Sequence, residues 1–222
     1  MSLYTRRCPF LQVDLSLMVE IASSSTTVVR PRRFTSDEVQ AMLRAGVLHE
    51  DDPLELIDGQ LVVMSPIHDP HIVCVNRLNT IFSRRLVTHE IEDVVVSVQN
   101  PVRIDEHNEP EPDVVLSTAL DGAPRPGTVL LLVEVSGSTL DYDRDVKRSL
   151  YARAGLPEVW IVNLDDQQIE VHRNPDGDVY RTRHLTGLDD TVTPERPAPI
   201  GTVPVRDILG DLPEPENSAT EP

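Results

Sequence analysis

The chain has 222 residues, 39% hydrophobic and 26% charged, which is typical of a globular domain, and no apolar run approaches the roughly 20 residues of a membrane-spanning helix. The formal net charge is −17, which argues against tight, non-specific binding of duplex DNA because such binding depends on Lys and Arg neutralising phosphates. Any nucleic-acid role must therefore rest on a local basic patch, on metal ions or on a partner.

The first 32 residues form a polar lead that we expect to be only partly ordered. Asp14 and Glu20 interrupt its apolar stretch, and no small-residue cleavage site follows, so we expect no signal peptide. The two cysteines, Cys8 and Cys74, fit a reducing compartment better than a disulfide scaffold. We therefore expect a cytoplasmic protein without a membrane segment.

Helix and turn signals follow the lead. Thr35 to Glu38 resembles a capping box, and the apolar residues after it are at helical spacing until Gly46. Leu54 to Met64 carries Asp58-Gly59 between two apolar arms, which predicts a β-hairpin. Asp69-Pro70 then starts a helix whose apolar stripe runs from Ile72 to Leu86.

The second half of the chain alternates strands with one helix. The pattern predicts a helix over Tyr142 to Ala154, which is long enough to be the crossover between two parallel strands. It predicts strands at Val94–Val98, extending towards Ile104, and at Asp113–Ser117, Val129–Ser136, Val159–Asn163, Gln168–Arg173 and Val179–Leu185. We expect an α/β (α+β) fold with a mixed β-sheet flanked by helices, an N-terminal helix and a hairpin. Residues 33–188 would form this domain, and 189–222 a segment rich in proline and acid.

One glutamate stands in an otherwise apolar strand. Val129 to Val135 reads Val-Leu-Leu-Leu-Val-Glu-Val, the pattern of a strand that is buried on both faces. An unpaired carboxylate in such a place is costly, so Glu134 needs a metal ion, a buried cation or a proton as its partner.

A second acid, Asp113, leads into the preceding strand. If the two strands are neighbours, Asp113 and Glu134 project from one end of the sheet, with the backbone carbonyl of Val135 as a further ligand. Mg²⁺ prefers such oxygen ligands. The alternative is that Asp113 caps a turn and Glu134 pairs with an arginine such as Arg148.

Lys147 follows on the predicted helix and is a candidate to orient water or to offset transition-state charge beside a metal. Alternatively it forms an ordinary surface pair with Asp143, four residues earlier. Tyr151 lies on the same helix face and either contributes to the site or packs.

The hairpin and the helix after it offer further candidates. Glu55 is left solvated by strand alternation or turns towards the two acids. His68 and His71 flank the start of the second helix, but further ligands for a closed zinc site are not apparent. His71 is a candidate contact for a substrate phosphate, and His68 for a capping or surface role.

Taken together, these motifs resemble a known family. The ordered set comprises Glu55-Leu56-Ile57-Asp58-Gly59, Met64-Ser65-Pro66, His71, Pro112-Asp113, Val133-Glu134-Val135-Ser136, Tyr142-Asp143-Arg144, Lys147, Tyr151, Gly155 and Glu158-Val159-Trp160-Ile161-Val162. It is similar to the Uma-two restriction endonuclease family of the PD-(D/E)XK nuclease superfamily, over roughly Arg33 to Leu185.

The resemblance implies a restriction-endonuclease-like core that holds Mg²⁺ or Mn²⁺ and hydrolyses phosphodiester bonds in DNA. Asp113 and Glu134 would be the metal ligands, Lys147 the catalytic lysine and Glu55 an additional acid. The superfamily's lysine two residues after the glutamate is replaced by Ser136, so Lys147 must reach the site from the following helix.

Two other functions compete with a nuclease. A non-catalytic interaction or regulatory protein on the same fold would explain the net charge, and hydrolysis of a phosphorylated small molecule is a third reading. Convergence of the acids and the lysine beside a positive groove, built from arginines such as Arg77, Arg84, Arg85, Arg148 and Arg153, would favour a duplex nuclease. Convergence without such a groove would indicate a small or single-stranded substrate. We also expect a homodimer, since many nucleases that cut duplexes pair two sites.

Overall fold

The computed structural model describes residues 31–49, 51–66 and 68–213. The expectations for the lead, for Cys8 and for residues 214–222 lie outside these ranges. The helices are α1 (Ser36–Arg44), α2 (Asp69–Thr88), α3 (Leu140–Tyr142), the π-helical turn η2 (Asp143–Lys147), α4 (Arg148–Arg153), the 3-10 turn η3 (Ala198–Ile200) and α5 (Val205–Leu209). None of the described helices combines the length and apolar character needed to cross a membrane.

A mixed sheet of six strands, in the order β3-β4-β5-β6-β7-β8, forms the centre of the fold. Its strands are β3 (Val95–Val98), β4 (Val114–Ser117), β5 (Val129–Ser136), β6 (Glu158–Asn163), β7 (Gln168–Asp176) and β8 (Val179–Thr186). Only β5 and β6 pair in parallel, and the α3–η2–α4 run connects them. The predicted mixed sheet and its helical crossover are therefore confirmed.

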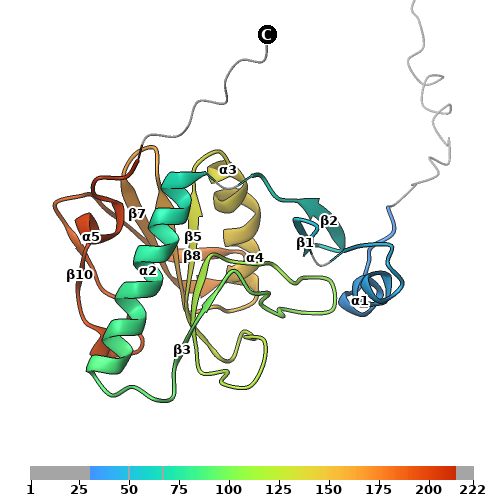
Figure 1. Ribbon diagram of the computed structural model, residues 1–222, viewed down its shortest axis with the longest axis horizontal. Coiled ribbons are helices and arrows are strands. Elements are labelled where there is room, and N and C mark those ends of the chain that lie inside the picture. Colours follow the sequence, from blue (N-terminus) through green and yellow to red (C-terminus); the bar gives the residue numbers. More distant parts are fainter. Residues whose placement is uncertain (1–30, 50, 67, 214–222) are drawn as a thin grey trace, which may run out of the picture. The chain divides into compact units, whose positions relative to one another are not determined.

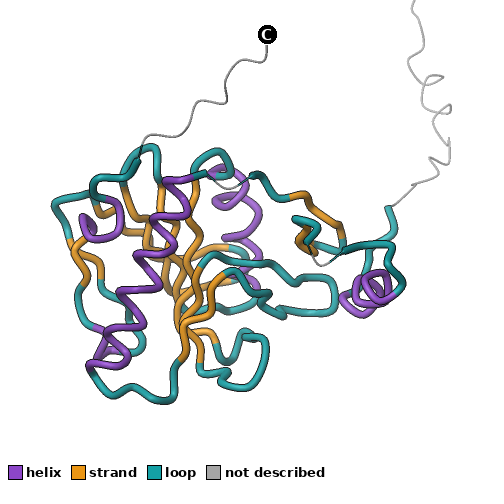
Figure 2. Tube along the Cα trace, in the orientation of Figure 1, coloured by secondary structure: helices purple, strands orange, loops and turns teal. Residues whose placement is uncertain are grey.

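Helices cover both faces of this sheet (Figures 1 and 2). On one face, α2 and α5 pack on alternate residues of β5 such as Leu131, Val133 and Val135. On the other, α4 packs on Val129 and Leu132. The almost continuous apolar sequence of β5 follows from its central position, which is covered on both sides. Its one acid, Glu134, must face the α4 side.

The N-terminal signals fold locally, as the sequence predicts. Thr35 and Glu38 form a reciprocal capping box at α1. Strands β1 (Leu54–Ile57) and β2 (Gln60–Val63) pair antiparallel around Asp58 and Gly59, which have positive φ angles of 51° and 74°. An added Cβ at Gly59 would lie 2.5 Å from the Cβ of Arg33, so this turn needs glycine for space as well as for conformation.

The C-terminal part of the described chain joins the core. Strands β9 (Thr191–Val192) and β10 (Val203–Pro204) pair antiparallel, and α5 places Val205, Ile208 and Leu209 in the cluster beneath α2. Arg77 and Arg85 of α2 donate hydrogen bonds to backbone carbonyls of this segment. The boundary at residue 188 stays a prediction.

Several elements differ from the prediction, most of them by a residue at a strand end. Strand β3 ends at Val98 and does not extend to Ile104, because Gln99 takes a positive φ of 48° that extended backbone does not have. The helix predicted over Tyr142 to Ala154 begins earlier, at Leu140, and its residues Asp143–Lys147 form the π-helical turn η2 instead of α-helix. Strand β7 continues to Asp176, so its turn to β8 falls at Gly177-Asp178.

Candidate active site

Asp113 and Glu134 lie next to each other because β4 and β5 are neighbouring antiparallel strands. Val114 pairs with Val133, and the two acids occupy the adjoining positions. Asp113 is 8% and Glu134 is 3% exposed. The Oδ2 of Asp113 accepts a hydrogen bond from the Val135 amide at 2.8 Å. Asp113 therefore binds strand backbone rather than capping a turn.

Among the residues that the structure describes, no arginine pairs with Glu134. Arg148 donates instead to the carbonyl of Arg144. The Oε1 of Glu134 accepts a hydrogen bond from the hydroxyl of Tyr151 and lies 3.4 Å from the Nζ of Lys147. Burial raises the pKa of Glu134 well above its ordinary value, and Lys147 opposes this only in part. The carboxyl group is therefore in a position that favours binding of a proton or a cation.

Lys147 is buried, being 1% exposed, and it touches three carboxylates. Its Nζ lies 2.9 Å from Glu55 Oε1, 3.4 Å from Glu134 Oε1 and 4.0 Å from Asp143 Oδ1. Burial by itself lowers the pKa of Lys147, but the charges of Glu134, Glu55 and Asp143 outweigh it, so the pKa lies above its ordinary value. The pair with Asp143 is therefore not a surface pair, and the lysine remains a cation.

A π-helical turn supplies Lys147. Residues 143–147 form η2, in which the amide of Arg148 donates to the carbonyl of Asp143, five residues earlier. Such turns occur frequently at functional sites. The Oδ2 of Asp143 accepts hydrogen bonds from Ser136 Oγ and Thr139 Oγ1, each at 2.8 Å, which fixes the turn against the end of β5.

Asp143 is the buried acid that the sequence analysis did not assign to the site. It was considered only as the partner of Lys147 in a surface pair, yet it is 4% exposed and faces Lys147. Its spacing of four residues from the lysine was the available signal, but that spacing alone does not distinguish a buried pair from a solvated one.

A second set of contacts anchors this turn to the sheet. Glu170 of β7 is 1% exposed and accepts hydrogen bonds from Arg144 and Arg183, with His172 Nε2 at 3.3 Å. Burial by itself raises the pKa of Glu170, but the hydrogen bonds from His172 and Arg144 and the positive charges lower it to about 2. Arg144, which lies within η2, thus anchors this turn to strand β7.

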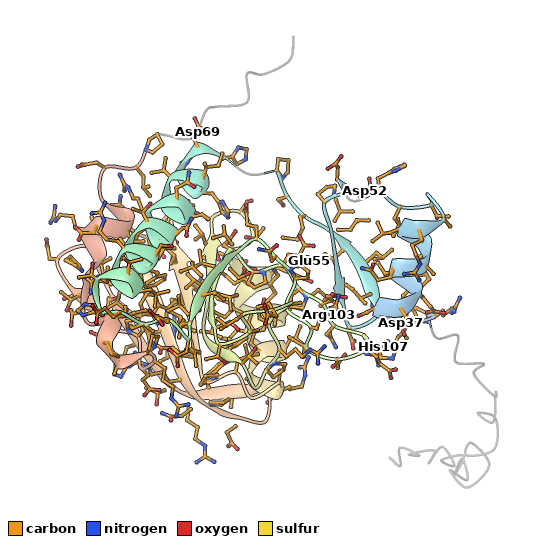
Figure 3. All side chains as sticks on the ribbon, turned by 60° about the horizontal axis from the view of Figure 1, so that its bottom comes forward. Asp37, Asp52, Glu55, Asp69, Arg103 and His107 are labelled. Carbon is orange, nitrogen blue, oxygen red and sulfur yellow. The ribbon has the colours of Figure 1, made fainter. Side chains whose placement is uncertain are left out.

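Glu55 projects from strand β1 of the hairpin (Figure 3), and its carboxylate contacts Lys147 of the same cluster. It is 1% exposed, so the solvated alternative is wrong. Its Oε1 accepts from Lys147 and from the amide of Glu111 at 2.9 Å, whereas its buried Oε2 has no hydrogen-bond partner within the part of the chain that the structure describes. Burial raises the pKa of Glu55, with Lys147 opposing this.

The two histidines behave differently. His71, in the first turn of α2, places Nε2 3.0 Å from Asp113 Oδ1. His68 is the N-cap residue of α2, but its side chain makes no capping hydrogen bond. Its side chain is exposed, so of the two expected roles the surface position is the one found.

The cluster opens into a cavity of about 1000 Å³. Among its described lining residues, five are acidic and one is a lysine, and none is an arginine: the acids are Glu111, Asp113, Glu134, Asp143 and Asp165. The arginines that would have built a positive groove therefore do not line this cavity, which is the arrangement that indicates a small or single-stranded substrate.

The donor set suits a hard divalent cation. The described residues contain no group of three or more His, Cys, Asp and Glu arranged to hold a metal. Mg²⁺, however, is usually held by one or two carboxylates together with waters and substrate phosphate. Asp113 and Glu134 match that requirement. The buried Oε2 of Glu55, which has no hydrogen-bond partner among the described residues, adds to the demand for positive charge.

Comparisons with known proteins bear on the fold and the family. A crystal structure from Anabaena variabilis, described as "a putative nuclease belonging to DUF820", is similar with a TM-score of 0.62 and 14% identity, over 79% of this chain and 97% of that chain. At this identity the likeness shows the fold alone. No curated protein matches the chain. The model of the Uma2 family, described as "Putative restriction endonuclease", matches residues 36–206, a range that includes every candidate residue above. The chain therefore belongs to the Uma2 family.

Proposed function

We propose that the protein is a metal-dependent endonuclease that hydrolyses phosphodiester bonds in DNA. The observation that carries the proposal is that Asp113, which directly precedes β4, Glu134 of β5 and Lys147 of η2 all line one cavity. Membership of the Uma2 family supports the same class of reaction.

Asp113 and Glu134, with the backbone carbonyl of Val135, would hold Mg²⁺ or Mn²⁺. When bound, such an ion polarises the phosphoryl oxygen and lowers the pKa of a coordinated water. The protein's own part is to orient the ligands. The Val135 amide and His71 fix the two oxygens of Asp113, and Tyr151 fixes Glu134.

Lys147 would act as a cation and not as a base, because its pKa is raised above the ordinary value. A fixed positive charge beside the scissile phosphate stabilises the negative charge that develops in the transition state. Glu55 accepts a hydrogen bond from Lys147 and would position it. Lys147 would thus take the part of the lysine that is replaced by Ser136.

His71 and Tyr151 were both considered as substrate contacts. His71 lines the cavity, so a contact with a substrate phosphate remains part of the proposal. Tyr151 is fully buried and is not among the cavity-lining residues. We therefore assign Tyr151 to holding Glu134. Action in the cytoplasm and assembly as a homodimer also belong to this proposal.

A non-catalytic interaction protein is the second candidate. The net charge of −17 and the acid-rich cavity favour it, because neither attracts a polyanion without a metal. This candidate predicts binding of a partner without hydrolysis of a phosphodiester.

Calorimetric titration with Mn²⁺ or Mg²⁺ separates the two candidates, when it is combined with nicking of supercoiled plasmid DNA and hydrolysis of bis(p-nitrophenyl) phosphate. We expect wild type to bind metal and to hydrolyse both substrates, and Asp113→Asn to lose metal binding and hydrolysis together. Asp189→Asn is the matched control, because the Asp189 side chain is 90% exposed and lies outside the site. A wild-type protein that binds no metal and hydrolyses neither substrate would refute the nuclease proposal.

A further inference from the structure

The reactive groups line the cavity and are almost fully buried. Asp113, Glu134 and Lys147 are 8%, 3% and 1% exposed, so a scissile phosphate must enter the cavity to reach them. The phosphates of duplex DNA lie on the outside of a stiff rod, with a persistence length of about 50 nm. A single strand can bend its backbone inward, whereas a duplex must first unpair locally.

The charge around the cavity also disfavours a duplex. Proteins that bind duplexes neutralise several phosphates of both strands with Lys and Arg. Here the one lysine of the lining is shared among three carboxylates. Arg77 and Arg85 donate to the backbone carbonyls of Ile208, Gly210 and Ile200, so their guanidinium groups are engaged within the protein. A substrate that presents few phosphates at a time fits this lining best.

Apolar side chains also line the cavity, beside the acidic ones. Met64 and Pro66 follow the hairpin, Pro70 starts α2, and Leu164 and Leu212 come from later segments. Such side chains can pack against the faces of nucleobases. These faces are available in unpaired strands and are covered by stacking within a duplex.

We propose that the cavity accepts an unpaired DNA strand, such as a loop, a flap or a single-stranded end, and discriminates against paired duplex. The inference rests on the proposed nuclease function, and it adds the class of substrate that the same site takes.

The test compares one labelled sequence in three forms, with the full chain and Mn²⁺: the strand alone, the strand in a blunt duplex, and the strand in a duplex with an unpaired tail. Because unpairing a duplex costs free energy, we expect the free strand to be cleaved at least about tenfold faster than the blunt duplex. We also expect the cuts in the tailed substrate to fall within the tail. Bis(p-nitrophenyl) phosphate serves as a probe of the chemistry that is independent of strandedness.

The outcomes distinguish failure of the single-strand preference from failure of the nuclease proposal. A blunt duplex that is cleaved as fast as the strand would overturn the inference and leave the nuclease proposal standing. Hydrolysis of the small diester but of no DNA would also overturn the inference, and would show a site for small substrates. If no substrate is hydrolysed, the nuclease proposal fails and the inference fails with it.

Substitutions of the apolar wall give a second test. We expect Met64→Ala and Leu164→Ala each to raise KM for the single strand about threefold or more, since packing on bases is lost. Val63→Ala is the matched control, because Val63 precedes Met64, is 71% exposed and is not part of the lining. Equal KM values for all these variants and wild type would contradict base packing in the cavity.

Discussion

Replacing Lys147 with Met tests the electrostatic core of the site. The substitution keeps an unbranched side chain in a position that is 1% exposed, but removes the cation that contacts Glu55, Glu134 and Asp143. Removing one partner of a buried ion pair costs about 3–5 kcal/mol. With three carboxylates left behind, we expect a loss of about 4 kcal/mol in the free energy of unfolding near pH 8.

The loss of stability in Lys147→Met should become smaller as the pH falls. Burial already raises the pKa of Glu134, and loss of the lysine raises it further. An acid with a higher pKa in the folded protein than in the unfolded chain binds protons more tightly when folded. The folded state therefore gains stability as the pH falls from above the folded pKa towards the ordinary value of 4.5. We expect the penalty to shrink between about pH 8 and about pH 5.

Urea unfolding followed by tryptophan fluorescence measures this penalty, because Trp160 is the only tryptophan and is fully buried. Arg181→Met is the matched control. Its side chain is 70% exposed and pairs with Asp176 at the surface, where ion pairs contribute about 0–1 kcal/mol. A Lys147→Met protein within about 1 kcal/mol of wild type near pH 8 would refute the reasoning, as would a penalty that does not change with pH.

Three further substitutions probe the supports of the site. Glu170→Gln should lower the free energy of unfolding by roughly 2–3 kcal/mol at neutral pH. The pKa of Glu170 is lowered to about 2, and each pKa unit corresponds to about 1.4 kcal/mol. The expected loss is smaller than the full shift because the arginine partners are partly exposed. A carboxyl group whose pKa is lowered by folding stabilises the folded state above pH 4.5, and this stabilisation is lost as the pH falls towards 2. Urea unfolding should therefore show that the difference in free energy of unfolding between the variant and wild type becomes smaller in acid. Gly59→Ala should place its new Cβ 2.5 Å from Arg33 Cβ at a φ of +74°; we expect faster hydrogen exchange confined to the β1–β2 hairpin, and unchanged exchange there would contradict this. Tyr151→Phe removes the donor to Glu134 and should lower the free energy of unfolding by about 1.5–3 kcal/mol, measured by urea unfolding, whereas a neutral effect would show that this hydrogen bond contributes little.

Local signals in the sequence were sufficient wherever a feature depends on neighbouring residues. The capping box at Thr35, the Asp58-Gly59 turn and the bounds of β5 are found as predicted, because each rests on hydrogen bonds or side-chain periodicity within a few residues. The sequence also indicated that Glu134 needs a partner, since its strand is apolar on both sides.

Only the tertiary structure decided what that partner is. Glu55 and Lys147 are 92 residues apart in the chain, yet Lys147 Nζ lies 2.9 Å from Glu55 Oε1 in the fold. Strand alternation could not show whether the side chain of Glu55 faces water. Likewise, Arg77 is engaged with carbonyls near the C-terminal end of the described chain, so it is not part of a groove. The sequence by itself determined most of the strands and helices and most of the candidate residues, but neither the π-helical turn η2 nor the burial of Asp143. The fold decided which carboxylates share the buried lysine, because burial and charge pairing depend on contacts between segments that are distant in the sequence.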